Sequence, residues 1–253
     1  MSRALGKDPL CKVPEVTLIF WIIKIFATTL GETGGDALSM SMHLGYLVST
    51  GIFGLIFLIA VIVQVRAKNF HPMIYWATIV ATTTVGTTMA DFADRSLHIG
   101  YAGGTTILLT LLLATLFVWH RTQGSIAVGT VNCTKTEIFY WVTIMFSQTL
   151  GTALGDWTAD SAGLGYTGGA IVFSVLLAAI AVAYYRTKIS RVALFWAAFI
   201  LTRPLGAVVG DFLDKPISHG GLALSRFAAS GTLLVFMLLS IVIFSPKAAK
   251  QAH

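Results

Sequence analysis

The chain alternates between long apolar stretches and short polar connections. A helix of about 20 apolar residues crosses a hydrocarbon core of roughly 30 Å, and stretches of this length recur along the whole sequence. Their ranges are 16–35, 44–65, 72–91, 99–119, 137–156, 165–185, 190–210 and 222–244. The pattern therefore predicts an all-α integral membrane protein with eight transmembrane helices.

The odd-numbered stretches share one motif. Each carries an aromatic residue followed by tryptophan, then glycine ten residues after the tryptophan and aspartate fifteen residues after it. The tryptophans are Trp21, Trp76, Trp141 and Trp196. Their spacings of 55, 65 and 55 residues indicate two successive duplications. Because each copy contains two spans, we expect four parallel repeats with a pseudo-fourfold arrangement.

These repeats divide the chain between two short tails. We assign repeats one to four to 16–68, 69–135, 136–189 and 190–245, and tails to 1–15 and 246–253. The organisation resembles a family of bacterial inner-membrane proteins with four tandem repeats of unknown function, each with two transmembrane segments and a characteristic tryptophan. The resemblance covers nearly the whole chain. It implies the architecture and the bacterial inner membrane, but no activity.

Basic residues lie mainly on one side of the predicted topology. Both tails and the second, fourth and sixth connections carry them, whereas the opposite connections hold only Arg95, Lys215 and Arg226. Since short cytoplasmic loops accumulate lysine and arginine, we expect both termini in the cytoplasm. This topology accounts for the net charge of +6, so no nucleic-acid partner is expected. With 56% hydrophobic and 11% charged residues, the expected surroundings are a lipid bilayer.

One face of every odd-numbered stretch is polar. At about 100° per residue, positions 0, 7, 11, 14, 15 and 18 after the tryptophan share a helical stripe, which Asp160 misses by one residue. The mid-stripe residues of the predicted transport pathway are Thr28, Thr83, Gln148, Arg203, Thr87 and Thr152. The even-numbered stretches are apolar all round. We therefore expect the odd helices to form an inner set and the even helices an outer, lipid-facing set.

Acidic residues gather near the far end of these stripes. The candidate metal ligands are Glu32, Asp36, Asp91, Asp94, Asp156, Asp160, Asp211 and Asp214. Fifteen helical residues rise about 22 Å, which places the repeat aspartates in or beside the outer leaflet. Carboxylates and the carbonyl ends of helices favour cations. The alternatives are aspartates that end in outside solvent, or salt bridges with Arg95 and Lys215.

Histidines that follow three of the aspartates widen the choice of metal. The secondary ligand candidates are His43, His98 and His219, and the alternative for all three is plain loop residues. Carboxylates alone suit Mg²⁺, Mn²⁺ or Ca²⁺, and imidazole adds Zn²⁺ and other transition ions. The mixture favours Mn²⁺ as a bound cation, and the sequence indicates no other cofactor.

Several residues carry structural interpretations. We expect the small residues of the stripe to allow close helix packing and the tryptophans to act as interfacial anchors. We expect the Lys24 side chain to reach the inner boundary of the membrane. Arg203 requires a buried carboxylate partner, for which Glu32 or a neighbouring aspartate is the candidate. Such a pair is either a fixed structural contact or a counter-cation that couples proton release to binding.

The leading functional hypothesis is a secondary transporter that exports a small inorganic cation, plausibly divalent, with protons as the coupling species. A passive channel is the nearest alternative. The others are a sensor or assembly protein without flux, and a membrane enzyme with a carboxylate or metal site. We expect no enzymatic activity, since the chain contains no His-Glu-x-x-His motif, no Gly-x-Ser-x-Gly motif and no phosphate-binding glycine loop.

Overall fold

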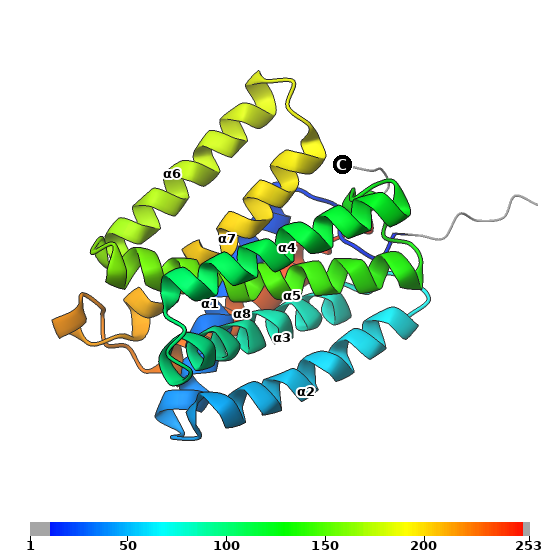
Figure 1. Ribbon diagram of the computed structural model, residues 1–253. Helices are drawn as coiled ribbons and strands as arrows, with labels where there is room; N and C mark the ends of the chain where they lie inside the picture. Colours follow the sequence, from blue (N-terminus) through cyan, green and yellow to red (C-terminus); the bar gives the residue numbers. More distant parts are fainter. Residues whose placement is uncertain (1–10, 250–253) are drawn as a thin grey trace, which may run out of the picture.

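The computed structural model describes residues 11–249, so parts of both predicted tails lie outside it. Eight long helices make up most of this range (Figure 1). They are α1 (Leu18–Asp36), α2 (Gly45–Arg66), α3 (Pro72–Asp91), α4 (Tyr101–Gln123), α5 (Thr134–Asp156), α6 (Gly165–Arg186), α7 (Arg191–Asp214) and α8 (Arg226–Phe244). Each predicted stretch coincides with one of them.

Five helices are long and apolar enough to cross a membrane: α2, α4, α6, α7 and α8. The other three carry the polar stripe more densely. In α3, for example, five buried threonines lie between Thr82 and Thr88. A polar face turned toward other helices lowers the mean hydropathy without exposing polar groups to lipid.

The odd-numbered helices form a ring. Helix α1 packs against α3 and α7, and α5 packs against the same two helices from the other side. Each outer helix packs on the inner helix of the following repeat: α2 on α3, α4 on α5, α6 on α7, and finally α8 on α1. The inner and outer helices differ in burial. In α7, 67% of the most apolar stretch is buried, whereas in α2 only 6% of it is.

Glycines let the inner helices approach closely. A Cβ atom on Gly31 would overlap the side chain of Thr83, and one on Gly206 would overlap Thr28. A Cβ atom on Gly151 would likewise overlap Arg203, and one on Gly86 would lie only 3.1 Å from Gln148, a tight contact. The glycine ten residues after each tryptophan therefore meets the residue seven after the tryptophan of the next repeat. This contact recurs round the whole ring, which explains the spacing found in the sequence.

Aromatic rings fill the end of the inner helices at which the four tryptophans lie, here called the aromatic end. Each aromatic residue that precedes a tryptophan packs on the tryptophan of the next repeat. The pairs and their centroid distances are Phe20–Trp76 at 5.4 Å, Tyr75–Trp141 at 5.7 Å, Tyr140–Trp196 at 6.2 Å and Phe195–Trp21 at 5.9 Å. Trp76, Trp141 and Trp196 are buried, so the prediction of interfacial anchors is wrong for these three. Their aromatic surface stabilises the ring instead.

Three chain segments cover the aromatic end. Residues 11–16 cross it, and the Lys12 ammonium lies 2.7 Å from the Glu137 carboxylate. The backbone of this segment pairs with the C-terminal segment, where the Ala249 amide donates to the Val13 carbonyl at 2.9 Å. The α4–α5 connection adds buried residues such as Val128. The extra ten residues between the second and third tryptophans thus help to close this end.

The glycine contacts generate a first prediction. Replacement of Gly31 by alanine forces Thr83 and the α1–α3 contact apart, so the free energy of unfolding in detergent should fall by about 1–3 kcal/mol. Gly34 on the same helix is the matched control, because a Cβ atom added there would meet no other atom within 4 Å. Gly34→Ala should leave stability unchanged or raise it by up to about 1 kcal/mol. Equal losses in both variants would contradict this packing.

Candidate functional site

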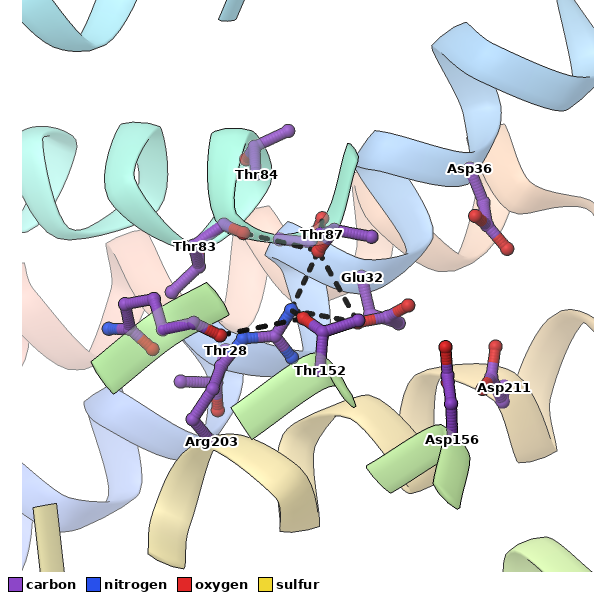
Figure 2. Close-up of polar contacts among 12 residues, drawn as sticks. Thr28, Glu32, Asp36, Thr83, Thr84, Thr87, Thr152, Asp156, Arg203 and Asp211 are labelled. Carbon is purple, nitrogen blue, oxygen red and sulfur yellow. Dashed lines mark hydrogen bonds and ion pairs between the residues drawn. The ribbon is translucent and has the colours of Figure 1, made fainter. Parts of the chain in front are cut away.

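Arg203 lies at the centre of the ring and is completely buried. Its Nη2 atom donates to Glu32 Oε2 at 2.8 Å, to Thr87 Oγ1 at 2.6 Å and to Thr152 Oγ1 at 2.5 Å (Figure 2). These three acceptors occupy the same position of repeats one, two and three, eleven residues after each tryptophan. One guanidinium on α7 is therefore bonded to all three other inner helices. The predicted Arg203–Glu32 pair is confirmed.

The six predicted pathway residues meet in this central layer, and all are completely buried. Thr28 and Thr83 donate to backbone carbonyls, such as that of Val80 at 2.8 Å from Thr83 Oγ1. Among the described residues, both polar atoms of the Gln148 amide and the Nε and Nη1 atoms of Arg203 lack a hydrogen-bond partner. The layer is thus polar but closely packed.

The four repeat aspartates lie at the other end of the ring, here called the acidic end. Asp36, Asp91, Asp156 and Asp211 are all buried. Figure 2 shows Asp36, Asp156 and Asp211 pointing toward a common region beside the Arg203 network. The sequence periodicity therefore predicted correctly that these side chains share one end of the inner helices.

Two basic residues bridge these aspartates in pairs. The Arg95 guanidinium lies 2.9 Å from Asp91 and 3.4 Å from Asp156. The Lys215 ammonium bonds to Asp36 and lies 3.1 Å from Asp211. Each bridge joins two neighbouring repeats, two with three and four with one. The salt-bridge alternative considered for the aspartates is thus present in the structure.

The pair between repeats four and one extends into a three-carboxylate cluster. One oxygen from each of Asp36, Asp211 and Asp214 lies within 4.8 Å of the other two, and all three residues are buried. Arg226 at the start of α8 lies 3.1 Å from Asp214. The Oδ1 atoms of Asp36 and Asp214 are buried and have no hydrogen-bond partner within residues 11–249. The cluster therefore retains unused oxygen ligands.

Lys215 begins the connection between α7 and α8, residues 215–225, which folds back over the acidic end. The Leu222 amide donates to the Phe212 carbonyl at 2.8 Å, and the Leu224 amide donates to the Leu213 carbonyl at 2.9 Å. Burial lowers the pKa of Lys215, but the carboxylates of Asp211 and Asp36 more than offset this and raise it above its ordinary value. The two carboxylates thus favour the charged form of Lys215.

Carboxylates outnumber basic groups in these ion pairs. Six buried acids take part: Glu32, Asp36, Asp91, Asp156, Asp211 and Asp214. Four basic residues pair with them: Arg95, Arg203, Lys215 and Arg226. Six acids against four bases leave two carboxyl groups without a balancing charge. Buried unbalanced charge is costly, and protons on these carboxyl groups or a bound cation would lower that cost.

Comparison with known families decides which group this chain joins. The family model described as "Repeat of Unknown Function (DUF347)" matches four times in tandem, at residues 19–70, 74–125, 139–190 and 194–245. The chain belongs to this family. Each matched repeat contains one inner and one outer helix. No curated protein and no solved structure matches the chain.

The fourth DUF347 repeat departs from the other three at the acidic end. In repeats one to three a single π-helical turn follows the aspartate: η1 (Ala37–Ser41), η2 (Phe92–Ser96) and η4 (Trp157–Ser161). In repeat four, α7 continues regularly to Asp214, and Lys215 follows. Repeat four also supplies Arg203. The two features that distinguish it thus both place a positive charge against acids of repeat one.

Two predicted acidic ligands, Asp94 and Asp160, take part in none of the ion pairs described above. Asp94 is 9% exposed and lies beside Gly104, and its Oδ1 atom lacks a hydrogen-bond partner in the described range. Asp160 is exposed and accepts a hydrogen bond from the Tyr101 hydroxyl at 3.3 Å. Its one-residue offset from the stripe accounts for the exposure.

The three histidines proposed as secondary ligands lie in turns and are not part of the carboxylate cluster. His43 and His98 are exposed and both have φ of 56°, in the left-handed region. Gly163 takes the same position in repeat three with φ of 68°. Histidine is among the few residues enriched in this conformation, which explains its presence there. His219 is also exposed, in the 3₁₀ turn η5 (Ile217–His219), so the prediction of histidine ligands is not supported by the placement of these residues.

Lys24 is placed differently from the prediction. It is completely buried, its ammonium lies 3.9 Å from the centre of the Phe199 ring, and it donates to the Phe199 carbonyl at 3.2 Å. The corresponding residues of the other repeats are Ile79, Ile144 and Phe199. That alignment was the signal that could have placed Lys24 inside the ring. The prediction of a boundary lysine is wrong.

The central ion pair generates a second prediction. Glu32→Gln and Arg203→Gln each leave one buried charge unpaired, so each should lower the free energy of unfolding in detergent by about 3–5 kcal/mol. The double variant should lose less than the sum of the two, because both charges are gone. Asp160→Asn, an exposed control, should change stability by less than about 0.5 kcal/mol. Additive losses would show that the two side chains act independently.

Proposed function

We propose that this protein is a secondary transporter of a small inorganic cation, a divalent ion such as Mn²⁺, exchanged for protons. The observation that carries the proposal is the cluster of Asp36, Asp211 and Asp214, whose oxygens converge within 4.8 Å inside the protein. Buried carboxylates with unused oxygen atoms are the ligands that hard divalent cations prefer.

The proposal places all eight helices across a bacterial inner membrane, with both termini in the cytoplasm and the acidic end toward the outside. The positive-inside distribution of lysine and arginine supports this orientation. The ring contacts, repeated from glycine to the next helix, support a pseudo-fourfold arrangement of four parallel repeats. The exposed apolar surfaces of the outer helices support contact with lipid.

The excess of two carboxyl groups supports exchange of one divalent cation against protons. Either the cation or the protons would balance the charge of the two excess carboxylates, since six acids face four bases in the ion pairs of the ring. The choice among metals rests on oxygen ligands alone, because the histidines lie in exposed turns. Mg²⁺, Mn²⁺ and Ca²⁺ therefore all remain within the chemistry of the site, and Zn²⁺ loses its support.

Lys215 acts in this proposal as an internal competitor of the transported cation. Its ammonium occupies the space between Asp36 and Asp211, where a metal would bind. The connection that carries it, residues 215–225, follows directly on the end of α7. Entry of a cation would require the lysine to leave, and its return would favour release. The structure then corresponds to the state in which the internal cation occupies the site.

Loss of one cluster carboxylate tests the function directly. In proteoliposomes loaded with a metal-sensitive dye, Asp36→Asn should reduce Mn²⁺ flux by about tenfold or more, because one charged ligand disappears. Asp160→Asn is the matched control, since Asp160 is an acid of the same end but is exposed. The control should transport at the wild-type rate. A pH gradient should drive flux in both the wild type and the control.

Other outcomes point to other functions. If Asp36→Asn and the corresponding changes of Asp211 and Asp214 all leave the flux of every tested cation intact, the transport site is not this cluster. Flux that ignores the pH gradient indicates a channel. A protein that is folded but moves no cation supports the sensor or assembly alternative, and turnover of a substrate without transport supports an enzyme.

Removal of the internal competitor is the next prediction. Lys215→Gln frees Asp36 and Asp211, so Mn²⁺ measured by calorimetry in detergent should bind about tenfold more tightly. The variant should also lose thermal stability without metal and regain it with metal, because the cation replaces the lost charge. Lys188→Gln, in the exposed α6–α7 turn, is the control and should change neither quantity. Unchanged affinity in Lys215→Gln would rule out competition.

A further inference from the structure

A groove opens on the outside of the ring between α1, α6 and α7. Its volume is about 430 Å³, and its lining is mostly apolar, with Trp21, Leu177 and Phe195 among the residues. It runs along α7 from Arg191 to Thr202. Eleven helical residues rise about 16 Å, which is close to half of a hydrocarbon core of roughly 30 Å. The groove therefore has the depth of one leaflet.

A second groove has the same origin in the repeat. It is formed by α2, α3 and α8, with a volume of about 260 Å³. The first groove is lined by Leu18, Trp21 and Ile25 of α1. The second is lined by Met73, Trp76 and Val80 of α3, at the same positions relative to the tryptophan. The shape is thus a consequence of outer helices that leave a gap beside Trp21 and Trp76.

The two grooves differ in charge. Arg191 lines the α1–α6–α7 groove, whereas the lining of the second groove contains no lysine or arginine. The Arg191 guanidinium stacks on the Tyr184 ring at 4.2 Å and bonds to the Tyr184 carbonyl, so it is held at the mouth. Arg186 and Lys188 are exposed in the same turn, which contains no acidic residue.

An apolar groove of one-leaflet depth that ends at a cluster of three basic residues matches an amphipathic anion. Basic residues at the membrane surface bind anionic lipid headgroups, and acyl chains fill apolar grooves. We infer that the α1–α6–α7 groove binds an anionic phospholipid, with an acyl chain along Trp21 and Phe195 and the phosphate at Arg191. This site is separate from the acidic end and does not depend on the proposed transport.

Native mass spectrometry of the purified full-length protein tests the inference. With phosphatidylglycerol and phosphatidylcholine added at equal concentration, the wild type should bind the anionic lipid preferentially. Arg191→Gln should weaken that binding about fivefold, because one basic contact is lost near the headgroup. Arg121→Gln is the matched control: Arg121 stacks on Phe117 at 5.1 Å but does not line the groove. The control should bind as the wild type does.

A second variant tests the acyl-chain part. Ala181 lines the groove from α6 and is exposed, so Ala181→Trp fills the groove without entering the core. It should reduce binding of both lipids, with an unchanged thermal unfolding midpoint as the check on folding. The inference is overturned if both variants keep the wild-type preference. It is also overturned if inorganic phosphate displaces the lipid, since the site would then recognise phosphate alone.

Discussion

A single buried guanidinium governs the arrangement of the inner helices. Arg203 has no contact with solvent. Its charge is balanced by Glu32, and its guanidinium also donates hydrogen bonds to two threonine hydroxyls, so that each of the other repeats supplies one acceptor. Such a geometry requires four backbones to approach within the reach of one side chain. Gly151 makes this possible, because any Cβ there would overlap Arg203. The position of the charge and the glycine that faces the Arg203 side chain are thus two parts of one constraint.

The ring has two chemically different ends, and its symmetry is broken at both. Aromatic residues and three chain segments close one end, where the Tyr75 and Tyr140 hydroxyls share a hydrogen bond of 2.6 Å. Carboxylates bridged by basic residues occupy the other. Repeat four differs most from the rest, and its acids lie beside those of repeat one. The unequal repeat therefore concentrates carboxylates at one junction of the ring, where four equal copies would spread them evenly.

Periodicity allowed much of this arrangement to be predicted, because spacing determines which residues share a face. The helices, the convergence of the repeat aspartates and the partner of Arg203 all follow from that rule. Contacts between repeats are a different matter. The burial of Trp76 and Lys24 depends on which helix faces them, and a stripe on one helix carries no such information. At His43, backbone conformation in the left-handed region explains the residue type, and a stripe on one helix does not show that conformation.

The order in which outer helices pack has a consequence for how such a protein arises. Each two-helix unit buries its outer helix against a different unit, α8 covers α1, and the segments beside these two helices pair at Pro14 and Ala248. A solitary unit would expose both halves of that contact. The same surfaces on four separate chains would close head to tail into a cyclic homotetramer. Gene fusion then needs only short linkers, after which single positions can diverge to place one arginine on the axis.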